Sequence, residues 1–576
     1  MGHFHDDSIY WLLSQSFRRG TFILASAPSA APPVNYQPGY PLLLSLFSWG
    51  TCYGAGKALS LVVTMGAVVA GGWCFQKTLG PLTAFGLVVW WASQPIPARY
   101  ASTLLSDPLF LLLCVVALSL HAVWVKKGDL VLALVAGYAC WVRPTGLVLV
   151  AALALDSLLR KNFRRCVLIL VSGFVFQGLL ALMWVGRAQG TNFFFSTLRG
   201  TFEGAPAGVY LNRVAQNARD YRDTFFHFCA FPLGRWSPSA PWLLWVGKIF
   251  VWGALGWGWI RALFTPLRSW AFFFVFHLVF LLFWVQSDFR YFLPLVPPSL
   301  LFLFLGLRGL IGPRWTTVFL VSSLFLSIAM TFDANARHRA GRGPALPTAT
   351  YRWMKENLPK EAVVAARFPH TMFLNTGLPG VALTLTYDPE PFLSGLIQTG
   401  ATHVLLDDLP PLDSSGLGPP SPNDWTRPWN MLISYRRWYE PVRRFELDGK
   451  TLYRIVADPG PFGGALRKFK NGILLLDQGR LDAARVSFEE AVSQIHGMPS
   501  AQDRLAQLEF RQGKYGEAEA GLRLLLKEWP ENVLARYHLY RLLQKSGDFR
   551  APAMEATVRA QALQYGFWPV LWWIEK

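Results

Sequence analysis

The chain has 576 residues, with 54 Lys and Arg against 35 Asp and Glu, which gives a formal net charge of +19 at pH 7. Apolar residues make up 52% of it and charged residues only 15%, whereas a soluble globular chain carries about 25% charged residues. This composition excludes intrinsic disorder and collagen, and a content of six Cys excludes a disulfide scaffold. It predicts a polytopic membrane protein with soluble appendages.

Ten apolar runs in the first 331 residues approach the length of about 20 residues that a helix needs to cross a bilayer. They lie at 57–75, 81–97, 104–125, 129–142, 145–159, 166–185, 241–262, 269–286, 291–307 and 315–331. The two shortest runs flank Arg143 and Pro144, and a tight helical hairpin is predicted there because a Pro ends the helix before it. The sequence therefore predicts an α-helical membrane domain with about ten or more spans.

Basic residues in alternate short loops predict which loops face the cytoplasm. These residues are Lys77, Lys126, Lys127, Arg160, Lys161, Arg164, Arg165, Arg261, Arg268, Arg308 and Arg314. The N-terminal segment, the loop 187–240 and everything after Met330 are then predicted to face outward. Because topology explains much of the positive charge, we expect no nucleic-acid partner, which would need basic residues gathered on one soluble face.

The chain is predicted to have four parts. Residues 1–56 form a first outer loop that carries the chemistry, 57–331 the transmembrane domain, 332–458 an extracytoplasmic α/β domain, and 463–576 a helical array. The first loop opens directly in a polar segment, without a signal peptide or a preceding span. Since an outer loop should follow a span, we expect a first helix upstream of Met1 to be missing.

The segment 341–457 has the pattern of a small α/β domain. Residues around 350–358 suit a helix, and 362–366 and 402–407 suit buried strands. A hairpin is predicted over 445–456, with Asp448 and Gly449 as a type I′ turn. The Pro, Ser and Gly-rich stretch 409–424 is predicted as a loop.

A repeat begins near residue 463. Gly479, Gly513 and Gly547 are 34 residues apart, and Ala484 and Ala518 follow the first two at the same offset. This period resembles tetratricopeptide repeats, in which the Gly lies at the turn between two helices. The third repeat departs from the pattern. Such a solenoid implies a protein partner or a supporting role, and no chemistry.

Adjacent carboxylates mark the predicted outer N-terminal segment. Asp6 and Asp7 repel each other, so one pKa should rise, which suits a general base. The alternative is structural, because one of the two would cap a helix over 8–17.

Further charged residues fall in other predicted outer loops. Asp107 follows Arg99 between two spans, Arg143 lies at the tip of the short hairpin, and Arg290 precedes Tyr291. Arg suits fork-like contact with a phosphate group. The alternative for each Arg is that it reaches the lipid headgroups from the end of a span.

Five short motifs follow one another on this predicted outer face. They are Asp-Asp-x-x-Tyr at 6–10, Tyr-x-Pro-Gly-Tyr-Pro at 36–41, Ser-Asp-Pro-Leu-Phe at 106–110, Arg-Pro-Thr-Gly at 143–146 and Arg-Tyr-Phe-Leu-Pro at 290–294. In this order they resemble the C-type (GT-C) membrane glycosyltransferases, and most of all the branch of protein O-mannosyltransferases and lipid A aminoarabinose transferases. The resemblance covers about residues 3–331, and two soluble segments, 351–359 and 400–407, are similar to an extracytoplasmic domain that many bacterial members append.

The resemblance implies an enzyme of the bacterial cytoplasmic (inner) membrane and cell envelope. It would move a sugar, with inversion, from a polyprenyl-phosphate donor to a protein, lipid or glycan outside that membrane. Carried over by motif, Asp6 or Asp7 would be the base and Asp107 a second acidic residue. Residues implied in binding the substrate or the lipid phosphate are Tyr10, Tyr40, Lys57, Arg99, Arg143, Arg290 and Tyr291. Membrane lipids, this donor and a protein on the repeats are the expected partners.

The sequence differs from the family pattern in two ways, and it also contains residues that could bind a metal ion. In the family a span precedes the acidic loop, and we expect that span to be missing from this sequence. The sequence also has Asp-Asp where many relatives have Asp-Glu. His3 and His5 beside two Asp are potential ligands of Zn²⁺ or Mn²⁺. Two His on a terminus are more often solvated, so we predict no cofactor.

Three other functions remain open. An O-antigen ligase or polymerase-like enzyme would centre its chemistry on a large outer loop, and 187–240 contains Arg213, Arg219, Arg222 and His227. A transporter would place charges within its spans, whereas these spans are nearly uncharged. An assembly scaffold would use the repeats and leave the acidic loops unexplained.

Overall fold

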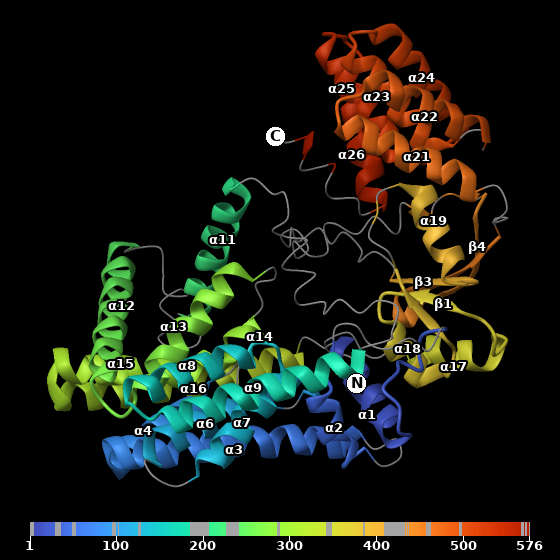
Figure 1. Ribbon diagram of the computed structural model, residues 1–576. Coiled ribbons are helices and arrows are strands. Elements are labelled where there is room, and N and C mark those ends of the chain that lie inside the picture. Colours follow the sequence, from blue (N-terminus) through green and yellow to red (C-terminus); the bar gives the residue numbers. More distant parts are fainter. Residues whose placement is uncertain are drawn as a thin grey trace. The chain divides into compact units, whose positions relative to one another are not determined.

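The computed structural model describes most of the chain (Figure 1). The described residues are 5–28, 36–48, 53–94, 100–101, 103–124, 128–184, 207–225, 241–284, 289–340, 348–383, 386, 388–407, 432–433, 435, 437–456, 462–494, 498–565, 570 and 573–574. They divide into two compact units. The first comprises Met1–Leu24 and Pro32–Gly343, and the second comprises Ala25–Ala31 and Pro344–Lys576.

The first unit is helical throughout its described residues. Its elements are α1 (His5–Arg18), α2 (Gly39–Ser45), α3 (Tyr53–Leu79), α4 (Pro81–Ala92), α6 (Ser106–Val123), α7 (Asp129–Val142), α8 (Gly146–Leu159), α9 (Phe163–Trp184), α11 (Ala207–Phe225), α12 (Pro241–Leu263), α13 (Arg268–Phe283), α14 (Phe289–Phe292), the 3-10 turn η3 (Leu293–Leu295), α15 (Val296–Leu310) and α16 (Gly312–Ala340). Residues 1–56, predicted as an outer loop, thus contain α1 and α2.

Three described helical stretches are long and apolar enough to cross a membrane: Tyr53–Leu79, Ser106–Val123 and Arg290–Leu310. The second and third are mostly buried in the protein, whereas the first turns two thirds of its apolar window outward, as a helix in contact with lipid would. Shorter apolar helices are Pro81–Ala92, Asp129–Val142, Gly146–Leu159 and Arg268–Phe283. The other spans of the predicted ten stay predictions.

The hairpin expected around Arg143 is present. The backbone N–H of Arg143 donates to Ala139 O at 3.0 Å and ends α7, and α8 begins three residues later at Gly146. A Cβ on Gly146 would lie 2.5 Å from the carbonyl carbon of Ala139, so only glycine fits this close approach. Gly39 lies equally close to the end of α7, since its Cβ would meet the Trp141 backbone at 2.8 Å. The two glycines therefore let α2 and α8 approach the end of α7, where the Tyr138 hydroxyl donates to Gly39 O at 2.8 Å.

The second unit contains a five-stranded mixed sheet. Its strands are β1 (Val364–Ala366), β2 (Gly380–Ala382), β3 (His403–Asp407), β4 (Tyr439–Phe445) and β5 (Lys450–Ile455), in the order β2-β1-β3-β5-β4. Strands β2, β1 and β3 are parallel, and β5 pairs antiparallel with both β3 and β4. The helices of this part are α17 (Thr348–Asn357), α18 (Pro369–Thr376) and α19 (Pro389–Gln398). The small α/β fold predicted for this segment is therefore present.

The predicted type I′ turn in the hairpin is wrong. Phe445 pairs with Lys450, so four residues form the connection, and Glu446–Asp448 form a 3-10 turn. A type I′ turn needs positive φ at both central residues, but only Gly449, at 58°, has it. The 3-10 turn uses residues that the sequence pattern had assigned to a strand, and β4 begins earlier, at Tyr439. The loop predicted at 409–424 lies outside the described residues.

A short N-terminal segment belongs to the second unit. Ser26 O accepts a hydrogen bond from the Gly380 N–H of β2 at 2.9 Å. The buried Ser26 hydroxyl also lies 2.6 Å from His370 Nδ1 of α18. Sequence reasoning gave no sign of this connection between an early segment and the sheet.

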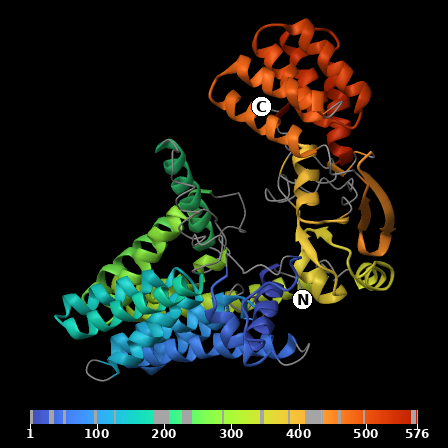
Figure 2. The same cartoon turned by 45° about the vertical axis from the view of Figure 1, so that its right-hand side comes forward.

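Three helical hairpins follow the sheet. They comprise α21 (Phe462–Asp477) with α22 (Leu481–Gln494), α23 (Pro499–Arg511) with α24 (Tyr515–Glu528), and α25 (Val533–Lys545) with α26 (Ala551–Tyr565). Gly479, Gly513 and Gly547 lie in the three turns at φ of 74°, 77° and 70°, a left-handed conformation that favours glycine. Figure 2 shows these helices packed side by side in orange and red. Their assignment to tetratricopeptide repeats stays a prediction.

One hydrophobic core runs from the sheet into the hairpins. Phe392 and Leu393 of α19 belong to the same buried cluster as Phe488 of α22 and Leu525 of α24. The buried Glu390 of α19 accepts hydrogen bonds from the N–H and the hydroxyl of Ser500, at the start of α23. The predicted domain boundaries stay predictions, but the sheet and the hairpins pack as one unit.

Candidate active site

The two adjacent aspartates lie in the first turn of α1. The helix begins at His5, so Asp6 and Asp7 are inside it rather than at its cap. The alternative that one of them caps a helix starting at Ser8 is therefore wrong. Acidic residues are favourable in a first turn, because the unpaired N–H groups there carry partial positive charge.

Asp6 is held by two side chains from distant parts of the sequence. The Tyr36 hydroxyl donates a hydrogen bond to Asp6 Oδ1 at 2.6 Å. The Arg290 guanidinium, on the short helix α14, donates to Asp6 Oδ2 and forms an ion pair with it. The side chains of Asp6 and Arg290 are 22% and 18% exposed. Asp6 thus remains accessible at the surface of the first unit.

A second ion pair joins Asp107 and Arg143. Asp107 lies in the first turn of α6, and Arg143 ends α7 and donates to Asp107 Oδ1. The Asp107 side chain is only 3% exposed, against 15% for Arg143. Burial of this kind requires the cation, because an uncompensated carboxylate in the interior is costly.

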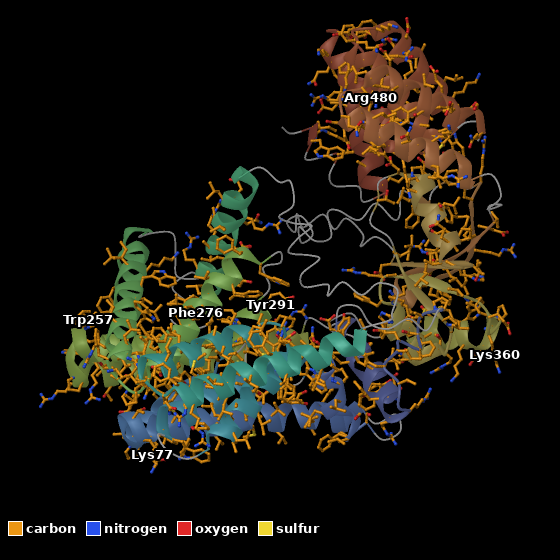
Figure 3. All side chains as sticks on the ribbon, in the orientation of Figure 1. Lys77, Trp257, Phe276, Tyr291, Lys360 and Arg480 are labelled. Carbon is orange, nitrogen blue, oxygen red and sulfur yellow. The ribbon has the colours of Figure 1, made fainter. Side chains whose placement is uncertain are left out.

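Tyr291 connects the two ion pairs. The centroid of its ring lies 5.0 Å from Cζ of Arg143 and 5.1 Å from Cζ of Arg290, so both guanidinium groups contact the aromatic ring. We call Asp6, Asp107, Arg143, Arg290 and Tyr291 the Tyr291 cluster. Tyr291 is labelled in Figure 3. Five residues that the sequence nominated singly are therefore one contiguous group.

Asp7 has a different environment from Asp6. It is buried, and its Oδ1 has no hydrogen-bond partner among the residues that the structure describes. Burial, with a smaller contribution from the negative charge of Asp6, raises the pKa of Asp7 to about 7, although Lys57 and the Leu104 N–H oppose the shift. We predicted that one pKa of the pair is raised by repulsion. The direction agrees, but desolvation is the larger cause.

Three tyrosines near Asp6 pack against one another. The rings of Tyr10 and Tyr36 meet edge to face at 5.3 Å, and those of Tyr10 and Tyr40 at 5.1 Å. The hydroxyl of Tyr10 hydrogen-bonds Ser106 at 2.9 Å, next to Asp107. Burial raises the pKa of all three tyrosines, so they stay neutral hydrogen-bonding groups.

Sequence reasoning missed Tyr36 as a site residue. Tyr36 could have been recognised because it begins the Tyr-x-Pro-Gly-Tyr-Pro motif, but only Tyr40 of that motif was predicted as a site residue. Tyr40 instead hydrogen-bonds Ser60 of α3 at 3.1 Å and is buried. Lys57, on the first turns of α3, is exposed and acts on Asp7 through its charge.

Other nominated residues lie outside the described part of the chain. These are Arg99, His3 and His227, together with the side chain of His5. Among the described residues, no group of three His, Cys, Asp or Glu is placed to hold a metal ion. That the chain uses no cofactor stays a prediction.

Helix α11, part of the predicted outer loop 187–240, supports the Tyr291 cluster. The Asn217 amide nitrogen lies 3.2, 3.0 and 2.7 Å from the carbonyl oxygens of Leu281, Leu282 and Trp284, at the end of α13. The Tyr221 ring stacks on Phe292 of α14. Since α14 carries Arg290 and Tyr291, these contacts fix the segment that supplies one cation and the ring. Sequence reasoning did not identify Asn217.

A second carboxylate group lies at the other ends of α6 and α8. The fully buried Asp156 contacts His121 Nε2 at 2.9 Å, Arg160 Nε at 3.0 Å and Arg268 Nε at 2.5 Å. We call these four residues the Asp156 cluster. The view that the spans are nearly uncharged overlooked Asp156 and His121, both of which lie inside predicted spans. Arg160 and Arg268 were assigned only to cytoplasmic loops.

No family model and no curated protein matches the chain. Its structure is similar to crystal structures of ArnT from Cupriavidus metallidurans. The apo form matches at 14% identity with a TM-score of 0.48, covering 78% of this chain and 92% of that one. The form bound to undecaprenyl phosphate matches at 14% identity with a TM-score of 0.49, covering 79% and 94%.

Proposed function

We propose that the chain is an inverting glycosyltransferase of the cytoplasmic membrane. It transfers a sugar from a polyprenyl-phosphate donor to an acceptor on the outer face. The observation that carries this proposal is the Tyr291 cluster, in which an accessible carboxylate and two arginines meet over one aromatic ring. Two of its segments begin helices long enough to cross a membrane, so a lipid tail and a phosphate group would both be accommodated.

The chemistry follows from the charges. An acceptor hydroxyl attacks the anomeric carbon of the donor while the bond from that carbon to the phosphate oxygen breaks. The phosphate leaves as an anion and needs no proton, so Arg143 and Arg290 stabilise its developing charge. A carboxylate takes the proton of the acceptor hydroxyl. A single displacement from the opposite face inverts the anomeric carbon.

Asp6 is the better candidate for the base. A base must reach the proton that it removes, and the Asp6 side chain is 22% exposed, whereas Asp7 is buried below it. Asp7 has the pKa nearer to neutrality, at about 7, but that value results from its removal from water. We assign the base to Asp6 and a role in supporting the first turn of α1 to Asp7. Asp107 holds Arg143 in place.

The remaining roles follow from the resemblance of the sequence motifs to C-type glycosyltransferases. The acceptor is a protein, a lipid or a glycan of the bacterial cell envelope. The second unit faces outward, and its hairpins are tetratricopeptide-like repeats that bind a protein partner. The period of 34 residues and a glycine in each turn support this assignment.

A transfer assay on the full chain in lipid nanodiscs tests the proposal. The probes are radiolabelled sugars on undecaprenyl phosphate, offered with envelope extracts from a deletion strain. We expect Asp6→Asn to slow transfer by at least about 100-fold, because it removes the base. Asp7→Asn should stay within about tenfold of the parent rate, because Asp7 supports the helix turn without touching the acceptor.

The matched control is Asp482→Asn, which removes the same charge from the first turn of α22 in the second unit. It should leave the rate unchanged. Full activity in Asp6→Asn, Asp7→Asn and the double variant would contradict the assignment of the base. No transfer by the parent chain from any undecaprenyl-phosphate sugar would contradict the function itself.

A further inference from the structure

Both arginines of the Tyr291 cluster have a carboxylate partner. Arg143 is paired with Asp107, and Arg290 is paired with Asp6. A phosphate group that entered this cluster would compete with a carboxylate for each guanidinium. To gain a strong ion pair it must take one guanidinium away from its carboxylate.

Burial decides which of the two ion pairs opens. The Asp107 side chain is 3% exposed, so removing Arg143 would leave a buried carboxylate without a counterion. Asp6 is 22% exposed and keeps the hydrogen bond from the Tyr36 hydroxyl, at 2.6 Å, when Arg290 leaves. Opening the Asp6–Arg290 pair is therefore the less costly exchange.

Arg290 is also placed to make this exchange with a small movement. Its guanidinium packs against the Tyr291 ring at 5.1 Å, and its Nη2 lies 3.3 Å from the Tyr291 hydroxyl. These contacts hold the guanidinium over the ring independently of Asp6. Arg143 lies on the same ring at 5.0 Å, so a phosphate drawn to Arg290 is also close to the second cation.

We propose that the donor phosphate displaces Asp6 from Arg290, and that this exchange activates the base. Before the donor binds, Asp6 is neutralised by Arg290 and is a weak base. Once Arg290 turns to the phosphate, Asp6 loses that positive charge, keeps the Tyr36 hydrogen bond and can accept the proton of the acceptor. The inference rests on the proposed function and adds an order to it: the donor binds before the acceptor is activated. Tyr36 is a positioning residue in this scheme.

If the phosphate and Asp6 compete for Arg290, removing the Asp6 carboxylate should strengthen phosphate binding. The probe is decyl phosphate, which has a lipid tail and a phosphate but no sugar, titrated calorimetrically into the full chain in nanodiscs. We expect Asp6→Asn to bind it about fivefold more tightly than the parent, because the competing carboxylate is gone. Asp482→Asn, the matched control, should bind it with the parent affinity.

Tyr36→Phe tests the second part of the inference. It removes the hydroxyl that stabilises Asp6 after release, so decyl phosphate should bind about threefold more weakly. In the Asp6→Asn background the same substitution should have no effect, because no carboxylate is released. A merely structural role of Tyr36 would instead weaken binding equally in both backgrounds.

The results separate this inference from the proposed function. If the parent binds decyl phosphate and Asp6→Asn binds it equally or more weakly, the exchange is overturned while the function stands. If the parent binds no decyl phosphate, both are overturned. If Asp6→Asn fails to fold, labelling of Asp6 in the parent by a water-soluble carbodiimide and glycine ethyl ester decides. Labelling should rise several-fold with decyl phosphate, and an unchanged yield would overturn the exchange.

Discussion

The two ends of α6 and α8 each carry a carboxylate group with arginines, and the two groups differ in how they are buried and paired. In the Asp156 cluster, one fully buried carboxylate receives three side-chain donors shared over both of its oxygens. In the Tyr291 cluster, two carboxylates are each ion-paired with a partly exposed arginine, and the neighbouring Asp7 has an oxygen without a hydrogen-bond partner among the described residues.

This difference distinguishes a carboxylate that stabilises the fold from one that can take part in binding and catalysis. A fully buried carboxylate that contacts three basic side chains is closed to a ligand, and its ion pairs fix the helices that carry them. An accessible carboxylate that contacts an arginine and a hydroxyl can exchange a partner when an anion arrives. The same residue types therefore serve different purposes, and burial distinguishes them.

The largest predicted effect is on stability and comes from the Asp156 cluster. Asp156→Ala leaves Arg160, Arg268 and His121 packed together without their anion, which should lower the free energy of unfolding by about 3–5 kcal/mol. Chemical unfolding in detergent micelles measures the change. Asp129→Ala is the control, because Asp129 forms an ion pair with Arg165 and is more exposed than Asp156, so its loss should cost about 1 kcal/mol. Equal losses of unfolding free energy in the two variants would contradict the structural role assigned to the Asp156 cluster.

The next effect is a dependence of stability on pH. The pKa of Asp7 is raised to about 7, so between about pH 4 and pH 7 the folded chain binds a proton that the unfolded chain has lost. Protonation of Asp7 therefore makes its whole contribution to the free energy of unfolding below about pH 4. The contribution falls as the pH rises, and about 2–4 kcal/mol of it is lost by pH 8.

Asp7→Asn is neutral at every pH and should remove this fall. The difference between the parent and the variant is measured by unfolding at pH 5 and at pH 8, with Asp482→Asn as the control. A parent chain that becomes more stable between these pH values, relative to Asp7→Asn, would show that Asp7 is ionised and paired.

Arg143→Gln should reduce the rate of transfer per folded molecule in addition to reducing stability. It removes a cation from the phosphate and leaves the buried Asp107 without its partner, and we expect kcat/KM to fall about 100-fold. Arg143→Lys keeps the charge and should recover part of the loss. A large loss of stability with an unchanged rate per folded molecule would place Arg143 with the architectural cluster.

The smallest effect concerns the support of α14. Asn217→Ala removes the amide that contacts three carbonyl oxygens at the end of α13, so Arg290 and Tyr291 lose part of their positioning. We expect KM for the donor to rise about fivefold, equivalent to about 1 kcal/mol, with little change in kcat. Arg219→Gln, at an exposed Arg on the same helix, is the control. An unchanged KM in Asn217→Ala would exclude the role of α11.

Local signals in the sequence predicted the local features. The glycines at a period of 34 residues lie in three helical turns, and the Arg-Pro-Thr-Gly motif predicted the turn after α7, because in both cases the residue type itself sets the backbone conformation. The hairpin at Asp448 was predicted with the wrong turn type, since strand-like residues before it form a 3-10 turn instead.

Contacts between distant residues could not be predicted in the same way. Asp6 and Arg290 are 284 residues apart, and only the packing of the helices shows that they meet. Tyr36 and Asn217 gave no charge signal, although Tyr36 stood within a recognised motif. Asp156 could have been found, because a carboxylate inside an apolar run must have a partner, but its partners Arg160 and Arg268 were counted only as loop charges.

One measurement tests the central claim most directly: transfer from an undecaprenyl-phosphate sugar, per folded molecule, by Asp6→Asn and Asp156→Asn in the same nanodiscs. The account predicts that Asp6→Asn folds with nearly the parent stability and loses at least about 100-fold in rate. It predicts that Asp156→Asn loses stability but keeps the rate of its folded fraction within about threefold. Equal losses of rate in both variants, or a normal rate in Asp6→Asn, would contradict it.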